Sequence, residues 1–200
     1  MKKKVLSIIA VLLMVAMLFS LTACGDDSKS SSSSSVEASS PKEAVEQFLD
    51  YVEAGKFSKA SKLVDWTKTY KVYDDSFYSW SSYDYADIED MSKKEWKEYE
   101  EDNESSIEDA QEYFEDYQDV VKKMASIKFK ADLEKAEKVD DAKNIYKVEA
   151  YVEMVWKENK KDEEDSSERS IDFYVIKENG EYYIIDGVYQ LKGLLADLYW

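Results

Sequence analysis

The residue types that most proteins use for chemistry near neutral pH are nearly absent from this chain. Its 200 residues include no histidine and a single cysteine, Cys24. Without histidine there is no general base titrating near neutrality, no Ser-His or Cys-His nucleophile, and no histidine ligand for zinc or haem. The sequence therefore predicts a protein that is not an enzyme and that holds no metal or cofactor.

Carboxylates are the one reactive group that the chain has in excess. The acidic run 162–165 and the pair Asp140-Asp141 offer hard oxygen ligands of the kind that Ca²⁺ prefers. Neither has the D-x-[DN]-x-[DN]-G spacing of a calcium-binding loop. We interpret both as solvated charge and expect no specific metal site in them.

A segment rich in Tyr and Trp, residues 70–85, mixes aromatic rings with Asp and Ser. Exposed Tyr and Trp side chains stack on sugar rings and anchor interfaces, because they offer a large contact area at little entropic cost. Tyr78, Trp80 and Tyr83 are therefore candidate binding residues. The sequence leaves open the alternative that these rings close one end of the core.

The first 23 residues have the layout of a secretory signal. Three lysines precede the apolar run Val5–Leu21, which is followed by the small residues Thr22 and Ala23. The run is shorter than the roughly 20 apolar residues of a membrane span, and no basic cluster follows it. We expect residues 1–23 to be removed as a signal peptide.

Cys24, directly after this run, resembles the cysteine of the lipobox in bacterial lipoproteins. There the cysteine is diacylated through its sulfur and becomes the new N-terminus. The resemblance implies an extracytoplasmic protein anchored to the cell membrane by lipid, which two or three acyl chains hold stably. Residues 24–40 then form a Ser-rich segment, which predicts a flexible tether.

The charge of the chain excludes one class of partner. It has 44 acidic and 27 basic residues, a formal net charge of −17, and losing the signal's three lysines makes it more acidic still. Such a surface repels phosphate backbones, so we expect no nucleic-acid binding. The aromatic content argues against disorder, and the length of residues 41–200 fits a single domain with its own core.

Helices are expected first. Ser40, Pro41 and Glu43 form the pattern of a capped helix start, and apolar residues then follow at helical spacing up to Gly55. A shorter helix is expected after Gly55. Residues 67–90 have no clear pattern. A second capping box, Ser92 to Glu95, begins a long helical region that reaches residue 124.

Strands are expected next, because the apolar period changes to two at Ile127. Strands are predicted near residues 127–133, 146–156, 171–176 and 182–185, with a turn at 139–144 and a tight hairpin turn at 178–180. Together with the helices this predicts an α+β fold, with N-terminal helices packed on one face of a curved, four-stranded antiparallel meander. The last segment has leucines at helical spacing and predicts a short C-terminal amphipathic helix.

Two segments of the chain resemble a known superfamily. Residues 40–60, with their spaced pairs Ala44-Val45 and Phe48-Leu49, and the stretch 178–187 are similar to extracytoplasmic domains of the nuclear transport factor 2-like superfamily. Many of these are lipoproteins of Gram-positive bacteria. The resemblance implies a cone-shaped, cystatin-like α+β fold. It implies little about function, because this fold carries enzymes, binding proteins and scaffolds.

Enzymes of that superfamily often place an Asp and a Tyr inside the cone, where apolar walls raise a carboxyl pKa. The matching residues are Asp172 and Tyr174 on one strand face, and Asp186 on the neighbouring strand. The alternative is that both aspartates face solvent or end their strands. The superfamily also forms dimers through the sheet, which implies a homodimer as one form of this protein.

We therefore expect a lipid-anchored, non-catalytic domain that binds a small ligand or an envelope protein. The main alternative is a scaffold that self-associates through its sheet and has no small-molecule site. An Asp- and Tyr-based enzyme is the lesser alternative. A cavity among the core residues would favour binding, and a filled core would favour the scaffold; the residues in question are Phe129, Val148, Val152, Phe173 and Ile184.

Overall fold

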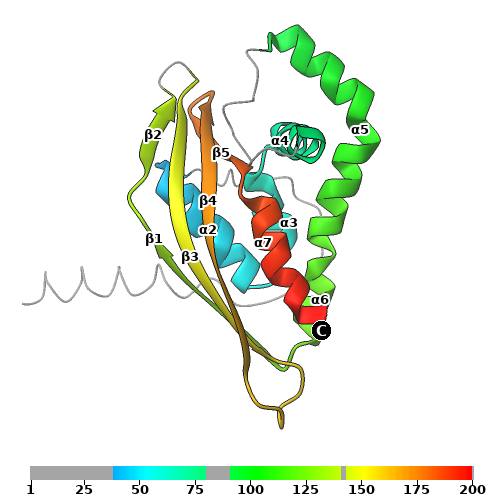
Figure 1. The fold of residues 1–200 in the computed structure, drawn as a ribbon, viewed down its shortest axis with the longest axis vertical. Coiled ribbons are helices and arrows are strands. Elements are labelled where there is room, and N and C mark those ends of the chain that lie inside the picture. The colour runs from blue at the N-terminus through cyan, green and yellow to red at the C-terminus, as the bar shows by residue number, and fades with distance from the viewer. Residues whose placement is uncertain (1–37, 80–90, 141–142, 200) are drawn as a thin grey trace, which may run out of the picture. The chain divides into compact units, whose positions relative to one another are not determined.

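The fold is α+β, with helices packed on an open antiparallel sheet (Figure 1). The structure is a computed structural model and describes residues 38–79, 91–140 and 143–199; within helix α4, side chains are described only as far as residue 74. The helices are α2 (Pro41–Glu53), α3 (Phe57–Ala60), α4 (Trp66–Ser79), α5 (Lys93–Glu115), α6 (Tyr117–Lys123) and α7 (Val188–Leu195). Two 3₁₀ turns, η1 (Ser61–Leu63) and η3 (Ala196–Tyr199), also lie within the described residues.

The sheet has five strands rather than the four that the alternation predicts. These are β1 (Ser126–Leu133), β2 (Glu137–Asp140), β3 (Ile145–Lys157), β4 (Asp165–Glu178) and β5 (Glu181–Asp186). The predicted turn at 139–144 starts too early, because Val139 and Asp140 belong to β2, which pairs with the start of β3; Lys143 and Asn144 are turn residues. β1 pairs with the rest of the same edge of β3, so β1 and β2 are two pieces of one interrupted edge strand.

The expected helix starts and turns are present. Ser40 accepts a hydrogen bond from the Glu43 N–H at 3.2 Å, and Ser92 forms a reciprocal capping box with Glu95. Asn179 and Gly180 both have positive φ, at 53° and 94°, as a two-residue hairpin turn requires. These local features fix where α2, α5 and the β4–β5 hairpin begin and turn.

The main core lies between the sheet and helices α2 and α7. α2 packs across β1, β3, β4 and β5, and α7 packs on β4 and β5. Alternate residues of β4, namely Ile171, Phe173 and Val175, are fully buried on this side. The leucines of the C-terminal segment, Leu191, Leu194, Leu195 and Leu198, are buried in the same core.

Aromatic rings fill the centre of this core. The Phe114 ring lies 5.8 Å from Phe48, 5.2 Å from Phe57 and 5.6 Å from Trp66, centroid to centroid. Phe48 also meets Phe173 of the sheet edge-on at 5.9 Å. Rings at these separations and angles are in favourable contact. The five residues on which the choice between a cavity and a filled core depends are all buried beside these rings: Phe129, Val148, Val152, Phe173 and Ile184.

A second, smaller apolar cluster lies where α4 and α5 meet the hairpin end of the sheet. Its buried members are Val72 of α4, Ile145 of β3, Ile176 of β4 and Ile185 of β5. Trp96, at the start of α5, packs against them. This cluster brings α4, α5 and the β4–β5 hairpin together, although they are far apart along the chain.

Candidate functional site

The structure brings the three acid–base candidates of β4 and β5 together. Tyr174 lies directly opposite Asp186 in the strand register, and Asp172 lies two residues along β4 on the same strand face as Tyr174. Asp186 is 4% exposed. Its Oδ1 accepts a hydrogen bond from the Gly187 N–H at 2.6 Å, whereas its Oδ2 is buried without a hydrogen-bond partner among the described residues.

The two carboxyl groups have different electrostatic environments. Burial raises the pKa of Asp186 to about 6, and the charge of Asp172 adds to this rise while the Gly187 N–H opposes it. Asp172 is half-buried and pairs with Lys147 Nζ at 2.9 Å. The Lys147 amine donates hydrogen bonds to Glu149 and Asp172, and these bonds raise the pKa of Lys147. Asp172 is therefore held in an ion pair, and Asp186 is enclosed.

The groove nearest to these carboxylates is small. Its volume is about 260 Å³, and Asp172 lines it, but Asp186 and Tyr174 do not. The other lining residues are Asp132, Glu134, Glu149, Ala150, Tyr151, Ser170 and Ile171. The predicted acid–base residues are thus neighbours in the fold, but of the three only Asp172 lines this groove.

The remaining sequence candidates lie at or beyond the limits of the described structure. Cys24, Trp80 and Tyr83 lie outside the described residues, and Tyr78 is in α4 beyond the last described side chain of that helix. Among the residues that the structure does describe, no group of three or more Asp, Glu or Cys side chains is arranged to hold a metal ion.

A larger groove, which the sequence did not reveal, lies at the junction of α4, α5 and the β4–β5 hairpin. We call it the hairpin groove. Its volume is about 410 Å³. It is lined by Lys68 of α4, by Lys93, Trp96, Lys97 and Glu100 of α5, and by Glu178 and Asn179 of the hairpin. This volume is within the range of small-molecule sites.

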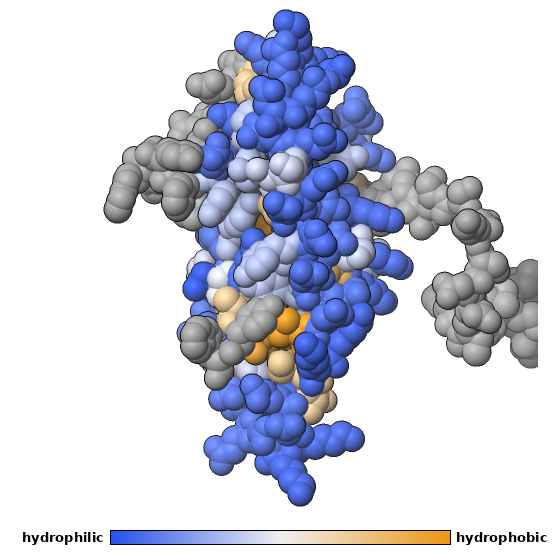
Figure 2. All heavy atoms as spheres, turned by 90° about the vertical axis from the view of Figure 1, so that its right-hand side faces the viewer, coloured by the Kyte–Doolittle hydropathy of each residue, from blue (hydrophilic) through white to orange (hydrophobic). Residues whose placement is uncertain are grey.

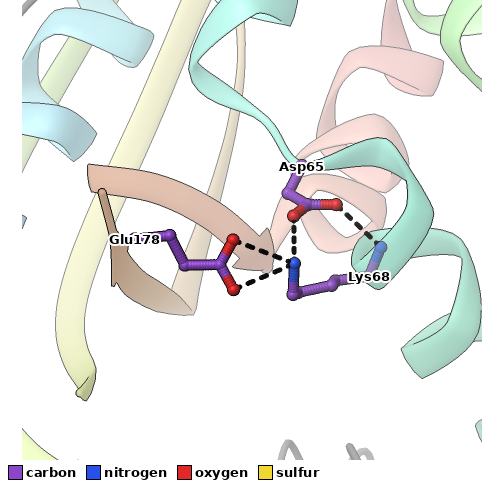
Figure 3. Close-up of polar contacts among 3 residues, drawn as sticks. All are labelled: Asp65, Lys68 and Glu178. Atoms are coloured by element: carbon purple, nitrogen blue, oxygen red, sulfur yellow. Dashed lines mark hydrogen bonds and ion pairs between the residues drawn. The ribbon is translucent and has the colours of Figure 1, made fainter. Parts of the chain in front are cut away.

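Lys68 forms the fixed part of this groove (Figure 3). Its Nζ lies 2.5 Å from Asp65 Oδ2 and 3.2 Å from Glu178 Oε1, and its side chain is 12% exposed. The same amine lies over the Trp96 ring, 5.3 Å from the ring centroid. Burial alone lowers the pKa of Lys68, but the carboxylates of Asp65 and Glu178 outweigh it, so the pKa is raised. Lys68 is therefore charged and held in one position.

Local structure explains why these side chains meet. The Asp65 N–H donates to the Ile184 carbonyl at 2.9 Å, which ties the start of α4 to β5. Asp65 Oδ1 then accepts from the Lys68 N–H at 3.0 Å and caps the helix. The capping box at Ser92 fixes the start of α5, and the turn at Asn179 fixes the β4–β5 hairpin; these two elements form the other walls of the groove.

A third groove, of about 580 Å³, lies between α3 and the junction of α5 with α6; we call it the acidic groove. Its lining residues are Ser58, Glu108, Gln111, Glu112, Glu115, Asp116, Gln118 and Asp119. Figure 2 shows one face of the molecule as mostly hydrophilic, with scattered hydrophobic areas. A wall of carboxylates without basic side chains attracts cations in general rather than one ligand.

Comparison with known proteins adds no assignment to this geometry. No family model and no curated protein matches the chain. Within the part of the chain that the structure describes, no helix is long and apolar enough to cross a membrane. The site must therefore be interpreted from its own residues.

Sequence reasoning missed the hairpin groove because its walls meet only in the folded chain. Lys68 and Glu178 are 110 residues apart. The helical pattern after Ser92 predicted that Trp96 lies in a helix, and nothing in the sequence indicated a binding function for it. The one available signal was Asp65 three residues before Lys68, a spacing typical of a helix cap beside an ion pair.

Proposed function

We propose that this protein is a lipid-anchored, extracytoplasmic, non-catalytic domain that binds a small ligand or an envelope partner at the hairpin groove. The observation that carries the proposal is the contrast between the two apolar regions. Phe114 and its aromatic neighbours occupy the interior, whereas Trp96 is partly buried and lines a groove together with charged and amide groups. Binding is thus favoured at the surface rather than inside a cone.

The anchor part of the proposal depends on the signal-like leader and on Cys24, whose surroundings resemble a lipobox. Acyl chains on Cys24, followed by the Ser-rich tether, place the folded domain outside the membrane. Replacing the cysteine, as Cys24→Ala, is expected to release the protein from membranes in cell fractionation. A variant that still sediments with the membranes contradicts this part.

The non-catalytic part is supported by the absence of histidine and by the placement of the carboxylates. Asp186 has the near-neutral pKa that an acid–base group needs, but it does not line any of the three grooves described above. Asp172 forms an ion pair with Lys147. An Asp- and Tyr-based enzyme, as the nuclear transport factor 2-like resemblance would allow, has less support than binding.

The scaffold remains the second candidate because the residues that would line a cavity are buried in the core. Its expected interface, the solvent face of the sheet, carries paired polar groups: Lys147 with Glu149 and Asp172, and Tyr151 with Glu168. A paired, polar face gains little from burial against a second copy. Sedimentation of the full chain tests this, since a concentration-dependent dimer favours the scaffold.

Thermal unfolding of the full chain in detergent, against a panel of ligands, tests the proposed function. The panel contains Ca²⁺, neutral glycans, cell-wall fragments and hydrophobic small molecules. A ligand at 100 times its dissociation constant adds about 2.7 kcal/mol and raises Tm by several degrees. The proposal predicts such a rise for one class, and its loss in the groove variant Lys93→Gln/Glu100→Gln. A panel without any shift contradicts binding of a small ligand and favours the scaffold.

A further inference from the structure

The hairpin groove also indicates which class of small ligand it fits; this inference rests on the proposed function. Its charged side chains nearly balance. Lys68, Lys93 and Lys97 line it together with Glu100 and Glu178, and Asp65 lies directly behind Lys68. A balanced groove does not select a cation or an anion.

This balance is unusual for the molecule. The whole chain has a net charge of −17, and the acidic groove has no basic side chain in its wall. A free anion approaching the protein is repelled, and a cation is drawn to the acidic surface in general. For a neutral ligand, the acidic surface neither repels the ligand from the hairpin groove nor competes with the groove for it.

The groove also offers hydrogen-bond donors and acceptors side by side. The amines of Lys93 and Lys97 donate, the carboxylate of Glu100 accepts, and the side-chain amide of Asn179 does both. A ligand that satisfies such a wall needs several groups that each donate and accept. Hydroxyl groups are the simplest groups with that property.

Trp96 adds a planar apolar surface to this wall. Lys68 covers one part of the indole and is itself held by Asp65 and Glu178. Trp96 is partly buried and is one of the residues that line the groove. Since Lys68 and Trp96 hold one another in place, little conformational entropy is lost when a ligand packs on the indole.

We propose that the hairpin groove binds a neutral saccharide of one or two rings, with the apolar C–H face of a ring on Trp96 and its hydroxyl groups on Lys93, Glu100 and Asn179. The volume of about 410 Å³ accommodates a ligand of that size. Neutral hydroxyl groups match the mixed donors and acceptors of the wall, and a neutral ligand avoids repulsion by the acidic surface.

The test is titration of the full chain with cellobiose, maltose and diacetylchitobiose, in a detergent without a sugar headgroup, followed by NMR. Saturable shifts are expected at the Trp96 indole N–H and the Asn179 amide for at least one saccharide. Glu100→Gln and Lys93→Gln, both at exposed positions, are expected to weaken that binding about tenfold, which is about 1.4 kcal/mol.

Lys94→Gln is the matched control. Lys94 lies on the same helix turn, is 83% exposed in its side chain and pairs with Glu98 outside the groove. Its replacement is expected to leave saccharide binding unchanged. Absence of saturable shifts with all three saccharides overturns the inference, and so does binding that the groove variants leave intact. If another ligand class raises Tm in a groove-dependent manner, the proposed function stands and the saccharide inference fails.

Discussion

At the scale of single residues, the structure encloses two charges that the fold treats in opposite ways. Lys68 is enclosed together with two carboxylates, so its charge is compensated. Asp186 is enclosed with one backbone N–H and with Asp172 as its charged neighbour. Burying an uncompensated charge costs free energy of folding. In a buried ion pair, removing one partner leaves the other charge uncompensated and destabilises the fold. Each case gives a prediction.

Removing the charge of Asp186 is expected to stabilise the protein at neutral pH. The pKa of the folded carboxyl, about 6, lies above its ordinary value of 3.8, so the folded state binds this proton more tightly. The stability that this provides is fully present below pH 3.8 and is lost as the pH rises through 6. Asp186→Asn keeps the acceptor for Gly187 and should raise the free energy of unfolding at pH 7 by about 2–3 kcal/mol.

Urea unfolding at pH 7 and near pH 4 measures this effect. The advantage of Asp186→Asn should shrink toward zero at the lower pH. The control is Asp109→Asn, on the exposed face of α5, which should show no such pH-dependent difference. A variant that is less stable than the parent at pH 7 would show that the Asp186 charge is compensated in the folded protein.

Removing the amine of Lys68 is expected to destabilise the protein. Lys68→Met keeps most of the side chain but leaves Asp65 and Glu178 facing each other without a cation. We expect a loss of about 2 kcal/mol in urea unfolding. Lys94→Met breaks a solvent-exposed pair with Glu98 and should cost about 0.5 kcal/mol or less. Equal effects of the two changes would mean that the Lys68 cluster has no special stability.

At the scale of elements, short turns decide how the strands and helices meet. Gly187 has a φ of 97° and links β5 to α7, and Gly180 has a φ of 94° in the hairpin that forms one wall of the groove. The two glycines share a backbone conformation that other residues rarely adopt. They differ in their surroundings, because a Cβ at Gly187 would lie 2.6 Å from the Phe173 ring, whereas one at Gly180 meets nothing within 4 Å.

Alanine substitutions at Gly180 and Gly187 distinguish the cost of backbone strain from the cost of a steric clash. Gly180→Ala should cost about 1 kcal/mol, from the strained φ alone. Gly187→Ala should cost about 2–4 kcal/mol, because the new Cβ also meets Phe173 and the Asp172 carbonyl oxygen at 3.0 Å. Thermal unfolding of both variants measures the difference. If the two losses are equal, α7 can move away from β4 at little cost.

Elements whose signals are local were predictable from the sequence. The capping box at Ser92 and the hairpin turn at Asn179 and Gly180 are confirmed, because both are decided within four residues. Helix α4 was missed, since its only buried apolar side chains as far as residue 74 are Trp66 and Val72, too few to show a stripe. Strand β2 was missed because it is short, polar and next to a turn.

The same distinction applies to the candidate site. Asp172 and Tyr174 share a strand face through alternation, and their proximity to Asp186 follows from the short hairpin. The hairpin groove could not be predicted, because no local pattern indicates that α4 and α5 pack beside Glu178. That arrangement depends on the small apolar cluster around Ile176, in which Val72 and Trp96 meet the sheet.

At the scale of the whole molecule, strong acidity limits what the protein can bind. The net charge of −17 opposes folding through self-repulsion and weakens the approach of anions. Aromatic rings pack against one another in the core, and the groove of the proposed function lies at the surface. Of the three grooves described above, the hairpin groove is the one whose wall carries both lysines and carboxylates.

Self-repulsion at this scale predicts a salt dependence. Raising the ionic strength from about 10 to 150 mM shortens the screening length from about 30 to 8 Å and should raise Tm by a few degrees. Differential scanning calorimetry of the full chain in detergent measures it. A fall in Tm with salt would mean that the ion pairs of the fold contribute more than the net charge.

The central claim, an anchored extracytoplasmic domain with an open surface groove, is tested most directly by thiol labelling of intact cells. Cys24 is the chain's one cysteine, so Lys93→Cys adds a single thiol at the rim of the groove. If the Cys24 sulfur is acylated, we expect a membrane-impermeant maleimide to label Lys93→Cys on intact cells and to leave the parent chain unlabelled. Labelling of Lys93→Cys only after lysis, or labelling of the parent chain, would contradict it.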